Sequence, residues 1–194
     1  MSTTLSQEKS LGDFSALTLR SPRLLLRPLA TGDAGAMFGI FSDPEAMRYW
    51  SCAPWTEPAQ ADAMLAQAHT QMREGSALRL GIETADGRLI GMCNLHAFFK
   101  SNRRCEMGYI LGSRDWGRGY MHEALRALID YAMGTLELNR IEADIDPRNG
   151  ASAKLLERLA FRKEGYMPER WIVDGVVCDT ENYGLLRSYW LARV

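Results

Sequence analysis

The sequence predicts an α/β (α+β) domain with a mixed, mainly antiparallel central sheet of about seven strands flanked by helices. Three observations predict this fold class. Hydrophobic residues make up 46% of the 194 residues and charged residues 24%, which is typical of a globular protein with a substantial core. Short apolar runs with strand character alternate with longer stretches of helical periodicity. Asp-Gly pairs at 86–87 and 174–175 separate strand-like runs, and such pairs favour hairpins.

The first part of the domain reads as one strand followed by two helices. The apolar run Leu24–Leu26, bounded by prolines, predicts the strand. Residues 31–50 begin with cap-forming residues and show helical spacing until Asp43-Pro44 interrupts it. Residues 56–75 carry an apolar stripe and predict a second helix that Gly75 ends.

The remainder of the chain is predicted as a three-stranded meander followed by alternating helices and strands. The predicted elements are strands 77–84, 89–99 and 103–111, helix 120–133, strand 139–145, helix 147–161, and strands 161–171 and 176–190. We expect residues 1–17 to form a flexible N-terminal tail and residues 18–194 to form a single domain.

Composition excludes several classes of function. Lys and Arg total 23 against 24 Asp and Glu, so the net charge of -1 provides no basic field for a nucleic acid. The four cysteines are scattered without a CxxC pair, so we expect no metal site. No apolar run approaches the ~20 residues of a membrane span, and the N-terminus lacks the pattern of a signal peptide. We therefore expect a cytoplasmic protein without a membrane or nucleic-acid partner.

The stretch RDWGRGYMHEAL, residues 114–125, is the most informative motif. Gly117 and Gly119 stand directly before a predicted helix, although a glycine inside a helix costs roughly 1 kcal/mol relative to alanine. The first amides of a helix lack internal partners, and glycine lets an anion approach them closely. Arg114 and Arg118 add positive charge. The motif predicts a phosphate site, yet it matches neither the P-loop nor the dinucleotide fingerprint.

The spacing Arg114-x-x-Gly117-x-Gly119 resembles the signature of the GNAT superfamily of acyl-CoA-dependent N-acyltransferases. Segments SPRLLLRPL, EMGYIL and NGASAKLLERLAF resemble further parts of that family in the same order. The segment EGYMPERWIVDGVVCDTENYGLL resembles the closing hairpin of RimJ/RimL-type ribosomal-protein N-acetyltransferases. The resemblance covers residues 19–190 and departs from the family at Ala160, where glycine is usual. It implies a GNAT-like sheet and acetyl-CoA as the co-substrate.

The resemblance also implies which residues bind coenzyme A. The backbone amides of Ile110, Leu111 and Gly112 are expected to pair with the pantetheine arm at a point where two strands splay apart. The pyrophosphate is expected on the glycine turn. Asn149 is expected either to contact coenzyme A or to cap a helix. The residues expected around the pyrophosphate are Arg114, Gly117, Arg118, Gly119, Tyr120 and Met121.

Two residues are predicted to be catalytic. Glu106, on the strand that leads into the glycine turn, is the expected base for the attacking amine. Its alternative is a surface ion pair with Arg103 or Arg104. Ser152 is the expected proton donor to the leaving thiolate, as the resemblance implies, although serine also suits the first turn of a helix.

The acceptor side is less defined. Trp50 and Trp55 lie in a loop that either walls an acceptor pocket or plugs the edge of the core. His96 is a weaker base candidate that could reach the same cleft. Three acids of the closing hairpin either attract a cationic amine or are solvated; they are Asp174, Asp179 and Glu181.

The predicted reaction is acetyl transfer to a primary amine by direct attack. We expect the N-terminal α-amine of a protein as the acceptor. The alternatives are a small amine, such as a polyamine, amino acid or antibiotic, and a sensor that binds acyl-CoA without turnover. The ten methionines and aromatics such as Tyr183 and Trp190 suit either a homodimer interface or the core.

Overall fold

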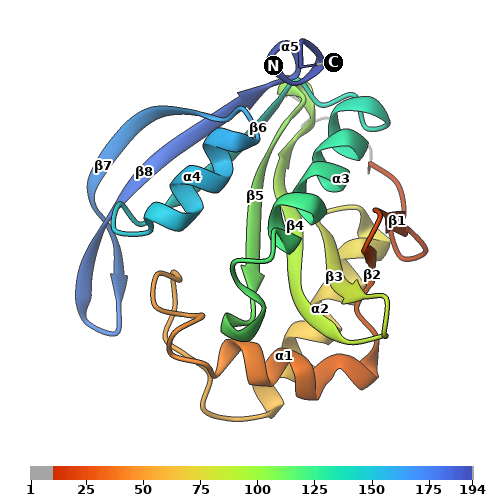
Figure 1. Ribbon diagram of the computed structural model, residues 1–194, viewed down its shortest axis with the longest axis vertical. Coiled ribbons are helices and arrows are strands. Elements are labelled where there is room, and N and C mark those ends of the chain that lie inside the picture. Colours follow the sequence, from red (N-terminus) through yellow and green to blue (C-terminus); the bar gives the residue numbers. More distant parts are fainter. Residues whose placement is uncertain (1–10, 194) are drawn as a thin grey trace, which may run out of the picture.

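The computed structural model describes residues 11–193. Within that range one eight-stranded sheet has the order β1-β2-β3-β4-β5-β6-β8-β7 (Figure 1). Neighbouring strands there are antiparallel except β5 and β6, which run parallel. The predicted mixed, mainly antiparallel sheet is confirmed, with one more strand than expected.

The strands are β1 (Leu19–Arg20), β2 (Leu24–Pro28), β3 (Leu78–Thr84), β4 (Leu89–Phe99), β5 (Arg104–Leu111), β6 (Arg140–Ile145), β7 (Arg162–Val173) and β8 (Val176–Leu186). The helices are α1 (Ala34–Phe41), α2 (Ala59–Glu74), α3 (Tyr120–Gly134), α4 (Gly150–Arg158) and α5 (Arg187–Leu191). Short 3-10 turns cover Thr31–Asp33, Lys100–Asn102 and Ser113–Asp115. No helix in residues 11–193 combines the length and apolarity needed to cross a membrane.

The two faces of the sheet carry different parts of the core. Side chains alternate between the faces along each strand. Met92 of β4 and Ile110 of β5 therefore pack with α1 and α2, whereas Cys93 and Leu111 pack with α3. Along β5, Glu106 and Gly108 share the face of Ile110, and Met107 and Tyr109 share the face of Leu111. Consecutive residues of this strand thus reach opposite sides of the sheet.

The sheet forks between β5 and β6. Their parallel pairing covers Arg104 to Glu106 on β5 and ends at the pair Glu106–Glu142. Beyond it, β5 continues beside β4 alone and β6 continues beside β8 alone, and Figure 1 shows the two strands diverging. The predicted splay is confirmed, and it leaves one edge of β5 without a neighbouring strand.

Both ends of the chain differ from the expectation. Residues 1–10 of the predicted tail lie outside the described residues, but Phe14 is buried in the core and its N–H donates to the Met72 carbonyl at 2.9 Å. Packing therefore begins before residue 18. The strand expected through residue 190 ends at Leu186, and α5 follows. Tyr183 and Trp190 are both buried in the core, which favours the core interpretation of these aromatics.

Candidate active site

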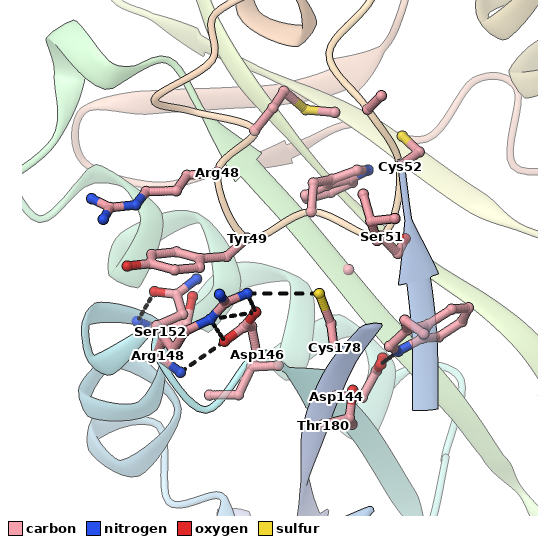
Figure 2. A pocket seen from close by; sticks show the side chains of 18 of the residues that line it. Arg48, Tyr49, Ser51, Cys52, Asp144, Asp146, Arg148, Ser152, Cys178 and Thr180 are labelled. Carbon is pink, nitrogen blue, oxygen red and sulfur yellow. Dashed lines mark hydrogen bonds and ion pairs between the residues drawn. The ribbon is translucent and has the colours of Figure 1, made fainter. Parts of the chain in front are cut away.

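A cavity of about 530 Å³ opens at the fork. Its walls come from β5, β6, the loop 44–54 after α1, the start of α4 and the β7–β8 hairpin. Figure 2 shows Tyr49 and Ser51 of the loop facing Arg148 and Cys178 across this space. Segments that are distant in the sequence therefore meet at the point where the sheet opens.

Glu106 occupies the last paired position before the fork and lines the cavity. The expected alternative, an ion pair with a neighbouring arginine, is wrong for Arg104. That guanidinium donates to Glu142 Oε2 at 2.8 Å and stacks 3.7 Å from the Phe99 ring centroid. Among the described residues, no side chain forms an ion pair with Glu106. Its carboxylate is therefore available to take a proton.

His96 faces Glu106 across β4 and β5 and also lines the cavity. Its Nδ1 lies 3.0 Å from the carbonyl oxygen of Glu106. Because a carbonyl oxygen only accepts hydrogen bonds, Nδ1 donates, and in the neutral ring Nε2 keeps its lone pair. His96 thus reaches the same cavity as Glu106, as expected.

Ser152 and Asn149 meet at the start of α4. Asn149 Oδ1 accepts the Ser152 N–H at 3.1 Å, so the capping interpretation of Asn149 is confirmed. Ser152 also faces Tyr109, which the sequence did not single out. Burial raises the pKa of Tyr109 to about 12, and the Ser152 hydroxyl acts in the opposite direction. Ser152 and Tyr109 both line the cavity from the α4 side, whereas Glu106 lies on the opposite face of β5.

The backbone of β5 presents its amides in two directions. The Gly112 N–H donates to the Ile90 carbonyl at 2.9 Å, which fixes the phase of the antiparallel pairing. Because hydrogen-bonded and open pairs alternate, Ile110 also directs its amide toward β4, while Leu111 directs its amide into the fork. The expectation for the amides of Ile110 and Gly112 is therefore wrong. The open edge carries the amides of Met107, Tyr109 and Leu111.

The glycine turn precedes α3 as predicted. Gly117 and Gly119 both have φ of 76°, a left-handed conformation. A Cβ built on Gly117 would meet no atom within 4 Å, so a ligand has room there. Among the described residues, the amides 119–122 donate to no backbone or side-chain acceptor. Arg114 and Arg118 are exposed beside the turn. This open backbone fits a phosphate group.

Two arginines that the sequence did not single out hold this turn. Arg23 Nη1 donates to the Arg118 carbonyl at 3.1 Å, and its Nε pairs with Glu123 at 2.7 Å. The Arg23 guanidinium also lies 4.7 Å from the ring centroid of Tyr120. On the other side, Arg88 forms two hydrogen bonds, at 2.7 and 2.9 Å, to the buried carboxylate of Asp115. The turn is thereby fixed before any ligand binds.

The two loop tryptophans have different surroundings. Trp50 lines the cavity and meets Phe41 edge to face, with ring centroids 5.6 Å apart. Trp55 stacks on Phe41 with centroids 4.4 Å apart and does not line the cavity. Both tryptophans pack against the edge of the core, and Trp50 also lines the cavity.

Acidic side chains of the cavity are partly engaged by neighbours. Asp146 accepts hydrogen bonds from Arg148, which are the largest influence lowering its pKa, and the same guanidinium lies 3.7 Å from Cys178 Sγ (Figure 2). Asp144 accepts from the Trp171 indole at 3.1 Å. The Asp146–Arg148 contact lies within one loop, whereas Asp144 with Trp171 and Arg148 with Cys178 join segments that are distant in the sequence, so local patterns do not predict those two.

The three acids expected in the closing hairpin differ in whether they line the cavity. Asp174 and Asp179 line the cavity, and Asp179 also accepts the Glu169 N–H at 2.8 Å. Glu181 pairs with Lys163 at 2.6 Å and lies outside the lining. Within residues 11–193 no group of three or more His, Cys, Asp or Glu side chains could hold a metal ion.

The open edge of β5 and the amide-rich turn together form a site for an elongated ligand with a phosphate-bearing end.

The family model for the acetyltransferase (GNAT) domain matches residues 23–162. The uncharacterized N-acetyltransferase p20 of Bacillus licheniformis is 37% identical over 171 residues, covering 88% of this chain and 96% of that protein. The ribosomal protein uS5-alanine N-acetyltransferase of Escherichia coli K12 is 35% identical over 120 residues, covering 61% and 62%.

A solved structure shares the fold. The spermidine N-acetyltransferase of Vibrio cholerae, in complex with CoA and spermine, aligns with a TM-score of 0.77 at 23% identity, covering 87% of this chain and 98% of that one. This chain belongs to the GNAT acetyltransferase family, and it is an acyl-CoA-dependent N-acetyltransferase that uses acetyl-CoA. Since the similar proteins named here act on a ribosomal protein and on spermidine, the family alone does not fix the acceptor.

Proposed function

We propose that this enzyme acetylates the N-terminal α-amine of a protein, and that Glu106 is the base for direct attack. The observation that carries the proposal is the unpaired Glu106 carboxylate at the fork, inside the cavity. A protein acceptor is supported by apolar side chains at the cavity mouth. Val176 is 57% exposed and Trp171 37%, and both line the cavity. Such side chains suit contact with a polypeptide better than with a small cation.

The residues around the fork divide the work of the reaction. Acetyl-CoA supplies the acyl group as a thioester. Glu106 accepts one proton from the attacking amine, whose free pKa of about 7.7 to 8.0 makes only modest assistance necessary. The open-edge amides of β5 are placed to polarise the acyl carbonyl. Ser152 donates a proton to the leaving thiolate, and the neighbouring Tyr109 hydroxyl is placed to support it. A cytoplasmic location belongs to the same proposal.

The proposed binding of coenzyme A uses the elements already described. Leu111 on the open edge pairs with the pantetheine arm, and the turn at Gly117 and Gly119 holds the pyrophosphate with the first amides of α3. Arg114 and Arg118 contribute charge from the surface. Asn149 caps α4 through its Oδ1, and its amide nitrogen contacts the ligand.

A polyamine is the second candidate acceptor. Five carboxylates line the cavity, against the two guanidinium groups of Arg48 and Arg148, and an acidic cavity attracts a cationic substrate. The carboxylates are Glu106, Asp144, Asp146, Asp174 and Asp179.

An acceptor panel tests the proposal. Thiol release from acetyl-CoA is measured with an alanine-started peptide that lacks lysine, with the same peptide carrying a blocked N-terminus, and with spermidine. We expect turnover only with the free peptide amine. Turnover with spermidine alone would support the polyamine alternative, and acetyl-CoA binding without any transfer would support a sensor.

Variants at the fork test the two roles. Glu106→Gln is expected to lower kcat/KM, because the amide cannot take a proton. It should also remove from the pH profile the loss of activity at low pH that protonation of a carboxylate base causes. An unchanged pH profile would exclude Glu106 as the base. Ser152→Ala is expected to lower kcat with little change in acceptor KM, and wild-type turnover would remove the acid role.

A further inference from the structure

Asn94 of β4 carries a buried polar atom with no partner. The side chain lines the cavity, and the residue is only 9% exposed. Within the described residues, its Oδ1 makes no hydrogen bond. Gly108 lies directly opposite on β5, and a Cβ built there would come within 2.6 Å of Asn94 Oδ1. The glycine thus provides the space that this carbonyl oxygen occupies.

The position of Asn94 relative to the proposed base follows from the register. His96 pairs with Glu106 and Asn94 pairs with Gly108, so Asn94 and Glu106 are diagonal neighbours on one face of the sheet. Diagonal neighbours lie about 7–8 Å apart, and their side chains can approach a common atom between them. A nitrogen atom bound in the cavity beside Glu106 therefore lies within reach of Asn94 as well.

No donor among the described residues bonds this oxygen. Arg79 of β3 is the cross-strand neighbour of Asn94 on its other side, yet Arg79 Nε also lacks a partner among the described residues. A buried carbonyl without a donor is destabilising, because it has lost its bonds to water. A ligand N–H in the cavity would satisfy it once the amide rotates about χ2 and turns its oxygen from Gly108 toward the cavity.

We propose that Asn94 selects primary amines as acceptors by accepting the N–H that the base does not remove. The inference rests on the proposed role of Glu106. A primary amine has two N–H bonds. Glu106 takes the proton of one as the nitrogen–carbon bond forms and the carbon–sulfur bond breaks, while Ser152 supplies the thiolate proton. The second hydrogen stays on nitrogen in the product amide and donates to Asn94 Oδ1 throughout.

A secondary amine cannot satisfy both groups. Its single N–H is the one that Glu106 removes, and its extra carbon substituent is directed at the buried oxygen. Leaving such an acceptor unpaired is costly, which is how a polar site rejects an analogue that lacks one donor. Asn94 is therefore a specificity-determining residue that contacts the substrate.

The test compares matched substrates in matched variants. Asn94→Leu has a similar size without an acceptor, and Asn94→Asp keeps the acceptor oxygens. The substrates are an alanine-started peptide and the same peptide with N-methylalanine, or spermidine and a derivative methylated on both terminal nitrogens if only small amines react. In Asn94→Leu we expect kcat/KM for the primary amine to fall about 10- to 100-fold, with the N-methyl substrate within about threefold of wild type. Asn94→Asp should retain the preference for the primary amine. Equal losses on both substrates would overturn the proposal.

A second measurement separates this role from a structural one. The melting temperature of the free Asn94→Leu protein should equal or exceed that of wild type, because an unpaired buried oxygen is removed. A clear decrease in melting temperature would assign Asn94 to stability instead and overturn the proposal. Coenzyme A affinity should remain within about twofold in both variants. Lack of turnover by the wild-type protein on every amine would refute the proposed function, whereas an unchanged substrate ratio in Asn94→Leu would refute only the role of Asn94.

Discussion

Replacing Gly117 by alanine isolates the contribution of bare backbone to coenzyme A binding. Gly117 has φ of 76°, and a Cβ there would meet no protein atom within 4 Å. The side chain would instead enter the space that we assign to the pyrophosphate. Gly87, in the β3–β4 hairpin, supplies a matched control. Its φ is 80°, a Cβ there also meets nothing within 4 Å, and it does not line the cavity.

The two variants are expected to lose similar stability and to differ only in their affinity for CoA. A left-handed alanine costs about 1–2 kcal/mol, and the lower entropy of its unfolded chain returns about 0.4–1 kcal/mol. Both variants should therefore lose about 1 kcal/mol of stability, or about 2–4 °C in Tm for a chain of this size. Displacing one hydrogen bond to a charged phosphate costs a further 1.5–3 kcal/mol or so in Gly117→Ala, which raises the Kd for CoA about 10- to 150-fold.

Titration calorimetry with CoA and with a pantetheine thioester that lacks the pyrophosphate completes the comparison. Gly117→Ala should weaken CoA binding and leave the shorter ligand within about twofold, while Gly87→Ala should change neither Kd. Equal CoA affinities for the two variants would refute the backbone cradle. If Gly117→Ala weakened the binding of CoA and of the shorter ligand equally, the lost contact would lie in the part of the ligand that both share, not at the pyrophosphate.

Three further substitutions probe the cavity and the loop beside it. The Arg148 hydrogen bonds hold the pKa of Asp146 below its usual 3.8, so the stabilisation is present above about pH 4 and is lost as the pH falls through the lowered value. Asp146→Asn should therefore lower the melting temperature at pH 7, and its difference from wild type should shrink as the pH falls below about 4; a difference that stays constant with pH would contradict the linkage. Trp50→Ala should raise the acceptor KM and spare CoA affinity. Trp55→Ala should instead lower stability, by up to about 3 kcal/mol, through lost stacking on Phe41, and the reverse assignment would contradict the packing.

Local patterns predicted the glycine turn because its information is contiguous, whereas the splay at the fork was implied only by the resemblance. The glycines, the helix that follows them and the strand that precedes them occupy one stretch of the chain. The arginines that fix the turn could not be predicted in this way. Arg23 contacts Glu123 across 100 positions and Arg88 contacts Asp115 across 27, and a sequence shows such charges without showing their partners.

Two other errors have distinct physical causes. The amide directions of β5 depend on the register with β4, and a single bond from Gly112 to Ile90 fixes them. The strand expected through residue 190 includes residues 187–190, where tyrosine and tryptophan favour strands. Packing overrides this preference in α5, where the Trp190 indole donates to Asp130 of α3 at 2.8 Å. Tertiary contacts of this kind leave no local signal.

Ala160 shows how a departure in the sequence becomes a measurable strain. Its φ of 64° is left-handed, its N–H donates to Glu157 at 2.9 Å, and the Phe161 N–H donates to Leu156 at 3.0 Å. These bonds form a Schellman ending of α4, which normally places glycine at this position. Ala160→Gly should recover about 1–2 kcal/mol of conformational strain and lose about 0.4–1 kcal/mol to unfolded-chain entropy. The net gain of about 0.5–1 kcal/mol corresponds to about 1–4 °C in Tm. Ala66→Gly, at an exposed position inside α2, should cost about 1 kcal/mol instead. If both variants lower the melting temperature equally, the left-handed ending of α4 does not strain Ala160.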